Sequence, residues 1–326
     1  DNKEIFLPLL FLSFFYFPFH GRYAYQYIFL RYVGAKFLIS FSEDSIKISI
    51  PSYKANCKLI LIQNGLRDQY CFPKLNKNKK WKAEYYFVNS ENWKNWIQNK
   101  IDTKFIVTGS IKNNCFQRKK FQKIKKIVWI SHFTENKVVP ANFKKSRKNI
   151  SWDQDVLETN KICLNIIKKF CYEKNLPLVV LPKYKKGSSQ EKSFYEKFNL
   201  NLIENFKNSW QNSYEIIDSN SLVISTNSTL GLELFSRNIK VVFFGIRSIF
   251  LNDPSMRFGW PQKTSDIGPF WCNLNSEKDM INVIENVFQM NEQKWNKIVS
   301  QFNHLMMYDY GNKKVIKTLS SINLLK

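Results

Sequence analysis

Short apolar runs alternate with segments of helical spacing along most of the chain, and this alternation limits the possible folds more than any other sequence feature. A short apolar run is typical of a buried strand. Apolar residues that recur every three or four positions indicate a helix. Strands that alternate with helices form parallel sheets covered on both faces. The sequence therefore predicts an α/β protein of Rossmann-like units. The expected strands are residues 36–43, 57–62, 85–90, 104–110, 125–131, 176–183, 222–226 and 240–245.

A basic stretch without a long apolar run, residues 116–126, interrupts this pattern, which then starts again. The 326 residues suffice for two domains of about 150 residues each. We therefore expect a Rossmann-like acceptor domain over 1–120, a Rossmann-like nucleotide-binding domain over 121–290 and C-terminal helices over 291–326. Two such domains would face a central cleft. Ligands of open α/β sheets bind beyond the carboxyl ends of the strands, so residues just after each strand are the candidates for a site.

An uncharged segment, IFLPLLFLSFFYFPF at residues 5–19, raises the question of a membrane span. It is shorter than the roughly 20 residues that a spanning helix needs, and it contains Pro8 and Pro18. It also lacks the basic start and the small-residue cleavage site of a signal peptide. We expect a buried first strand followed by a loop.

The net charge of +24 is compatible with three kinds of partner: nucleic acid, an anionic membrane surface, or anionic small substrates such as sugar nucleotides. The abundance of Lys, Asn and Ile is typical of AT-rich coding sequence, which raises the charge without selection for nucleic-acid binding. The basic runs at 74–82 and 116–126 lack the glycine-and-aromatic pattern of an RNA-recognition strand, so nucleic acid is a disfavoured partner. Lys-rich loops would instead favour peripheral attachment to an anionic inner membrane face, at about 1 kcal/mol per Lys near the surface.

The six cysteines contain no CxxC pair, and the chain has three histidines. This usage is typical of a reduced, cytoplasmic protein with buried thiols and argues against a zinc site. We expect no metal and no cofactor.

Five small polar residues, Ser-Thr-Asn-Ser-Thr at 225–229, separate an expected strand from an expected helix. Backbone N–H groups at a helix N-terminus bind anions, so Ser228 and Thr229 are candidates for a phosphate site. An ordinary helix cap by either residue is the alternative. Gly231 would let a group approach the first turn, and Glu233 could accept hydrogen bonds from ribose hydroxyls. The segment matches neither GxxxxGK[ST] nor GxGxxG.

Polar residues also follow the strand at 57–62. Asn64 precedes a glycine, and such a pair forms a tight turn, which is one interpretation. The other is that Gln63, Asn64 and Arg67 project into the cleft, where Arg67 could bind a phosphate or carboxylate through two hydrogen bonds.

His132 and Glu135 follow the strand at 125–131, and Lys183 follows the strand at 176–181. A histidine near a carboxylate can act as a general base, although a structural or solvent-facing role is the more common one. Lys183 could neutralise a phosphate, or it could be an ordinary surface lysine. The loop at 257–273 is rich in Gly, Pro and aromatic residues and could form either a core plug or a wall for a sugar or base.

Several of these segments together resemble bacterial surface-carbohydrate biosynthesis proteins, which are similar to glycosyltransferases of the GT-B architecture. The segments are QNGLR, VTGSIKNN, STNSTLGLELF before VVFF, and FGWP with GPFW. The resemblance covers about residues 23–290. The chain is more distantly similar to capsule-polysaccharide Kdo transferases, whose CMP-binding helix start matches residues 228–233. Asn64 stands where that family has Asp, and Pro182-Lys183 stand where it has His-Pro.

The resemblance implies a cytoplasmic, metal-independent enzyme that moves a sugar from a nucleotide-sugar donor to a surface polysaccharide or lipid-linked glycan. Ser228, Thr229 and Gly231 would form the donor phosphate site, Lys183 would add positive charge there, and Glu233 would bind ribose.

On the acceptor side the resemblance places Gln63 and Arg67. It leaves Asn64, His132 and Glu135 as candidate catalytic residues, the last two as the base. The alternatives are a CMP-Kdo-type transferase, a glycerophosphotransferase, or a non-catalytic glycan- or nucleic-acid-binding protein.

Overall fold

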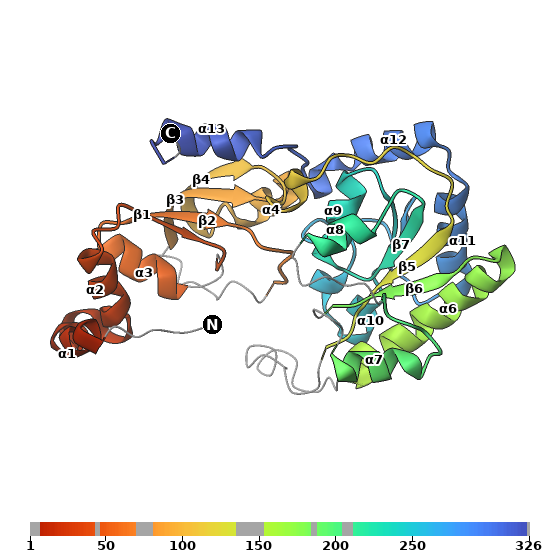
Figure 1. Cartoon of the computed structure of the whole chain (residues 1–326), viewed down its shortest axis with the longest axis horizontal. Helices are drawn as coiled ribbons and strands as arrows, with labels where there is room; N and C mark the ends of the chain where they lie inside the picture. Colours follow the sequence, from red (N-terminus) through yellow and green to blue (C-terminus); the bar gives the residue numbers. More distant parts are fainter. Residues whose placement is uncertain are drawn as a thin grey trace. The chain divides into compact units, whose positions relative to one another are not determined.

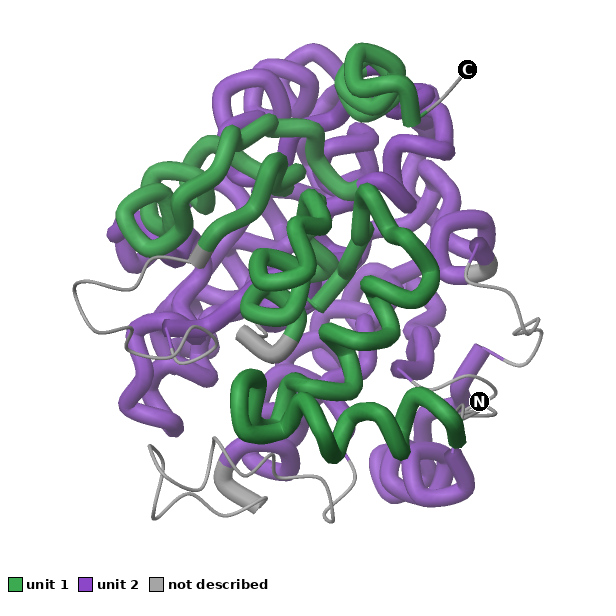
Figure 2. Tube along the Cα trace, turned by 90° about the vertical axis from the view of Figure 1, so that its left-hand side faces the viewer, with its two compact units in different colours: residues 1–65, 71–110, 314–326 green, residues 66–70, 111–313 purple. Residues whose placement is uncertain are grey.

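The computed structural model describes residues 7–42, 46–69, 81–134, 153–183, 188–203 and 211–324. The chain divides into two compact units (Figure 2). Unit 1 comprises residues 1–65, 71–110 and 314–326, and unit 2 comprises residues 66–70 and 111–313. Each unit contains one parallel sheet with helices packed on it, so the predicted α/β class with two parallel sheets is confirmed. Residues 111–120 thus fold with unit 2, and the last helix folds with unit 1.

The sheet of unit 1 has the strand order β1-β2-β3-β4, which follows the chain (Figure 1). In its two central strands, residues 59–62 and 86–88 are buried, as expected of strands covered on both faces. The last helix is fastened to this sheet by Lys314 Nζ, which donates to the carbonyl of Val107 at 3.1 Å. The bounds are β1 (Phe37–Ser40), β2 (Lys58–Ile62), β3 (Trp81–Val88) and β4 (Ile101–Val107), with helices α2 (Ala24–Tyr32), α3 (Ile46–Lys54), α4 (Glu91–Ile97) and α13 (Lys313–Ser321).

The segment expected to be a buried first strand is instead helix α1 (Leu7–His20), followed by a short 3-10 turn and α2. The prediction was wrong because a nearly continuous apolar run carries no periodicity that separates a strand from a helix. Pro8 lies in the first turn, where a missing N–H costs nothing, and Pro18 lies in the last turn. Among the described residues, no helix combines the length and the hydropathy needed to cross a membrane.

The sheet of unit 2 has the order β6-β5-β7-β8-β9 and is parallel throughout. Val128 of β5 pairs with Val179 of β6 on one side and with Val223 of β7 on the other. The chain therefore leaves β5 toward one edge and later returns to its other side, which makes the β5–β7 boundary a topological switch point. The strands are β5 (Lys126–Ile130), β6 (Leu178–Leu181), β7 (Ser221–Ser225), β8 (Lys240–Phe244) and β9 (Trp271–Cys272).

Helices cover this second sheet and close its core. Helix α9 packs on β7 and β8, and α11 packs on β8, β9 and α6. Lys240 Nζ donates to the carbonyls of Phe288 and Met290 and so binds the C-terminal end of α11 to β8. The helices are α6 (Glu158–Lys174), α7 (Ser189–Glu196), α8 (Asn212–Ile216), α9 (Thr229–Ser236), α10 (Arg247–Phe250), α11 (Glu277–Gln289) and α12 (Glu292–Gln301).

The aromatic loop at 257–273 contributes to the core of unit 2. Phe258 stacks on Trp271 with ring centroids 5.0 Å apart, and Phe270 stacks on Phe235 of α9 at 4.6 Å. All four side chains are buried. Of the two interpretations of this loop, the structure supports the core plug for these residues.

Candidate functional site

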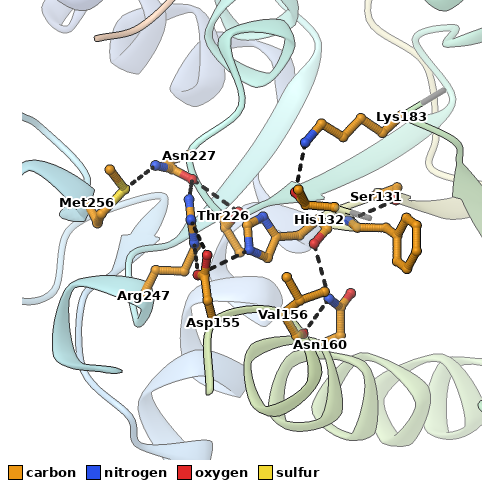
Figure 3. Close-up of polar contacts among 12 residues, drawn as sticks. Ser131, His132, Asp155, Val156, Asn160, Lys183, Thr226, Asn227, Arg247 and Met256 are labelled. Atoms are coloured by element: carbon orange, nitrogen blue, oxygen red, sulfur yellow. Dashed lines mark hydrogen bonds and ion pairs between the residues drawn. The ribbon is translucent and has the colours of Figure 1, made fainter. Parts of the chain in front are cut away.

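The switch point of the second sheet brings together four loops of unit 2 that the chain order keeps apart. Ligands of parallel α/β sheets bind at such points, beyond the carboxyl ends of the strands. Here β5 is followed by His132, β6 by Lys183, β7 by Asn227 and β8 by Arg247. Figure 3 shows these side chains approaching one another from their separate loops.

A chain of polar contacts joins three of the loops. His132 Nε2 lies 3.6 Å from Asp155 Oδ1, just beyond hydrogen-bonding distance. Arg247 donates two hydrogen bonds to the same carboxylate, from Nε to Oδ1 at 2.8 Å and from Nη2 to Oδ2 at 3.0 Å. Its Nη1 also donates to Asn227 Oδ1 at 2.7 Å (Figure 3). Because a bidentate pair fixes the plane of the guanidinium group, Arg247 is held in one orientation.

The backbone of the loop after β5 rests on a buried network of hydroxyl and amide groups. The His132 N–H donates to Tyr195 Oη at 3.2 Å, and its carbonyl accepts from Asn160 Nδ2 at 3.4 Å. The Tyr195 hydroxyl in turn donates to Ser131 Oγ at 3.0 Å, and Ser131 donates to Glu191. These contacts fix the main chain on both sides of the imidazole.

The environment of His132 keeps its imidazole neutral at pH 7. Burial and the charge of Arg247 outweigh Asp155 and lower the pKa of His132 to about 4. For Asp155, burial would raise the pKa, but the charge of Arg247, the nearby His132 imidazole and the hydrogen bonds from Arg247 hold the pKa well below its ordinary value. Asp155 is therefore a carboxylate, and His132 is a neutral hydrogen-bonding group.

Lys183 adds a second cation near Arg247. Its Nζ donates to Thr134 Oγ1 at 3.0 Å, and its backbone N–H donates to Glu191 Oε1 at 2.8 Å. The side chain as a whole is exposed, yet protein atoms around its ammonium group and the charge of Arg247 lower the pKa of Lys183. An anion bound between the two cations would relieve this repulsion.

Helix α9 begins beside this cluster without a side-chain cap. Ser228 occupies the N-cap position with extended backbone, and its side chain makes no capping hydrogen bond. Thr229 Oγ1 accepts a hydrogen bond from the Leu66 N–H at 2.9 Å instead. An ordinary cap by Ser228 is therefore not what the structure shows. Backbone N–H groups in the first turn of α9 can therefore donate hydrogen bonds to a bound anion.

Two other residues of this segment are engaged inside unit 2. A Cβ atom at Gly231 would lie 2.8 Å from Phe243 Cε1, so the group that approaches this glycine is a core ring of β8. Glu233 is buried and accepts a hydrogen bond from Tyr214 Oη at 2.8 Å. The donor-binding roles of both residues stay predictions.

The contact at Gly231 gives a prediction for stability. We expect Gly231→Ala to lower the free energy of unfolding by about 2 kcal/mol, because overpacking a filled core typically costs 1–3 kcal/mol. Urea denaturation would measure this loss. Combined with Phe243→Leu, which removes the opposing ring edge, the alanine should cost less than it does alone; equal costs in both backgrounds would contradict the close contact.

The candidate site residues that follow β2 belong to different units of the structure. Gln63 is buried, accepts from the Asn89 N–H at 2.8 Å and donates to the Gly65 carbonyl at 2.9 Å, which joins the ends of β2 and β3. Asn64 is exposed and belongs to unit 1, whereas Arg67 is half-buried and belongs to unit 2. Their acceptor and catalytic roles stay predictions. Glu135 lies outside the described residues.

Sequence reasoning missed Asp155, Asn227 and Arg247. Arg247 could have been found by the rule that located Lys183, since it follows the end of β8. Asn227 lies inside the polar segment already singled out. Asp155 gave no signal, because its partner Arg247 is 92 positions away in the chain. The described part of the chain holds no group of three His, Cys, Asp or Glu that could bind a metal ion.

Solved structures share this fold at low sequence identity. S. aureus MnaA in complex with UDP is 10% identical, with a TM-score of 0.51, and the match covers 100% of this chain and 81% of that one. The UDP-GlcNAc 2-epimerase of Methanocaldococcus jannaschii, in complex with UDP-GlcNAc and UDP, is 10% identical with a TM-score of 0.50, over 93% of this chain and 82% of that one. These likenesses show a GT-B-like two-domain fold.

The sequence itself connects the chain to surface-glycan synthesis. No curated protein is similar enough to the chain to count as a match. A protein family does match residues 60–323, a range that includes every strand of unit 2 and most of the sheet of unit 1. The chain therefore belongs to the family described as "putative O-antigen biosynthesis protein".

Proposed function

We propose that the chain is a nucleotide-sugar-dependent glycosyltransferase of surface-glycan synthesis, with the donor diphosphate bound at the switch point of unit 2. The observation that carries this proposal is the meeting of Lys183, Arg247 and the uncapped start of α9 in one place. Membership of an O-antigen family supports the biological role. The same fold in proteins solved with UDP and UDP-GlcNAc supports the class of donor.

The proposed chemistry transfers the anomeric carbon of the sugar from a phosphate oxygen to an acceptor hydroxyl. Negative charge builds up on the departing diphosphate as the carbon–oxygen bond breaks. Lys183, Arg247 and the N–H groups of α9 would stabilise this charge without reorganising, because Asp155 already fixes the guanidinium group. The acceptor hydroxyl must lose a proton, and the sequence offers Glu135 and His132 as the two candidate acceptors of it.

Between these two, the surroundings of His132 favour a different role. A pKa of about 4 makes its imidazole a weak base at neutral pH. A neutral ring can still donate a hydrogen bond to a phosphate oxygen, and a bound phosphate would itself raise the pKa of His132. We therefore assign His132 to the diphosphate side of the proposed site.

Nucleotide binding to the purified chain tests the proposal. Isothermal titration with UDP, GDP and CMP should show binding by at least one nucleotide, and Lys183→Met should weaken that binding about tenfold, the value of one charge-assisted hydrogen bond. Lys192→Met is the matched control, because Lys192 is an exposed lysine of α7 that belongs to the same unit. Absence of binding by every nucleotide, or equal losses in both variants, would contradict the proposed site.

Turnover of the donor separates transfer from other reactions. A transferase should release the nucleotide much faster when a lipid-linked glycan acceptor is present. Conversion of the sugar nucleotide at the same rate without acceptor would instead indicate an isomerase or hydrolase that uses the same diphosphate site.

A further inference from the structure

Helix α1 carries a large apolar surface that unit 1 leaves uncovered. Its exposed side chains, called here the α1 surface, are Leu7, Phe11, Phe14, Phe15, Phe17 and Phe19, with exposed fractions from 58% to 76%. Most of the large apolar side chains that are exposed in the described part of the chain lie within residues 7–41. Scattered exposed apolar residues are normal, but a contiguous patch of this kind marks an interaction site.

The helix is nevertheless fixed to unit 1 along one narrow face. Leu9 and Ser13 are buried, and His20 stacks on Tyr27 of α2 with ring centroids 3.9 Å apart. Lys54 Nζ of α3 also donates to the carbonyl of Phe19 at 3.1 Å. In Figure 1, α1 lies against α2. The aromatic side chains are thus presented on a folded support.

Within the described residues 7–42, which include α1 and α2, the charged Asp, Glu, Lys and Arg side chains all have one sign. Residues 5–42 contain no Asp or Glu, and their three basic residues, Arg22, Arg31 and Lys36, are all exposed. A second copy of the chain is a poor partner for this surface, because pairing would bring the same cations together. An anionic partner with an apolar interior complements both its charge and its aromatic side chains.

We propose that the α1 surface inserts into the interface of an anionic lipid bilayer and holds the protein at the membrane. With 14 residues, α1 is about 21 Å long, less than the roughly 30 Å of a hydrocarbon core, so it would lie within one leaflet. Its aromatic side chains enter the acyl region, while Arg22, Arg31 and Lys36 contact lipid phosphates. The match to the family begins at residue 60, so the α1 surface lies in a part of the chain outside that match.

Vesicle co-sedimentation of the full chain tests this inference. We expect binding to vesicles of phosphatidylglycerol and phosphatidylcholine and weaker binding to phosphatidylcholine alone. The variant Phe14→Ser/Phe15→Ser/Phe19→Ser should lower the partition coefficient at least tenfold, since burying a single Phe contributes roughly that factor. Arg31→Gln/Lys36→Gln should lower binding to the anionic vesicles selectively.

Tyr172→Ser is the matched control, because Tyr172 on α6 of unit 2 is 89% exposed and should not affect lipid binding. Circular dichroism of each variant should match the parent, since the changed side chains are exposed. Vesicle binding that is unchanged by the triple substitution would overturn the proposal. It would also be overturned by sedimentation velocity showing a dimer that the triple variant abolishes, together with no vesicle binding. Nucleotide affinity in solution should be the same in all variants, so this test is independent of the proposed function.

Discussion

Replacing Arg247 with Met should lower the free energy of unfolding by about 3 kcal/mol at neutral pH, because removing one partner of a buried ion pair leaves the other charge unpaired. Asp155 and Arg247 expose only 24% and 12% of their side chains. The carboxylate would lose both hydrogen bonds from the guanidinium group while remaining largely out of water. Urea denaturation at pH 7 measures the loss.

The second partner supplies the control for this prediction. Arg247→Met leaves the charge of Asp155 unpaired, and Asp155→Asn removes that charge. The double variant Asp155→Asn/Arg247→Met should therefore recover part of the stability that Arg247→Met loses. The pair also stabilises the fold only where Asp155 is ionised. Its pKa is depressed in the folded state, so the contribution is present above its ordinary pKa and is lost as the pH falls. A difference between parent and Arg247→Met that stays constant down to low pH would contradict the ion pair.

The same substitution should also affect the proposed diphosphate site. Arg247→Met should weaken nucleotide binding at least as much as Lys183→Met does, because both a cation and the anchor of Asn227 are lost. Titration at equal folded fraction would separate this effect from the loss of stability.

His132 should make the protein lose about 3 kcal/mol of stability between pH 6.5 and pH 4. Its pKa is about 4 in the folded state and near its ordinary 6.5 when unfolded, and one pKa unit corresponds to about 1.4 kcal/mol. In this window the unfolded chain binds a proton that the folded chain does not, so stability falls as the pH falls. Above pH 6.5 both states are neutral, and the effect is absent.

Denaturation of the parent and of His132→Gln at several pH values measures this contribution. The glutamine variant lacks the titrating group, so its stability should fall less steeply from pH 6.5 to 4. Arg247→Met should also reduce the slope, because the charge of Arg247 is one of the causes that lower the pKa of His132. A glutamine variant with the parental slope would show that other groups determine the acid sensitivity.

The two sheets could be predicted from the sequence because their signal is local. The run LVVL within 176–183 and the run KVVFF within 240–245 became β6 and β8 with bounds close to those expected. Strand β9, only two residues long, lies inside the aromatic loop and gave no such signal. Helix α1 was missed for the opposite reason, since its run is apolar at nearly every position and polar residues do not mark one face of it.

The candidate site could be predicted in part. The rule that ligands lie beyond strand ends selected His132, Lys183 and Ser228, and the structure brings the first two to the same cluster beside the start of α9. The ion pair between Asp155 and Arg247 depends on tertiary packing across 92 positions, which a local pattern does not contain. Gly231 illustrates a different limit, because its small size serves a core contact with Phe243 rather than an open approach.

The return of α13 to unit 1 determines the order in which the two units can be completed during synthesis. The strands of unit 1 are translated before those of unit 2, yet helix α13, which belongs to unit 1, begins only at Lys313. All of the sheet of unit 2 is translated before α13 can pack on β4. The sheet of unit 1 therefore lacks α13 throughout the synthesis of the sheet of unit 2.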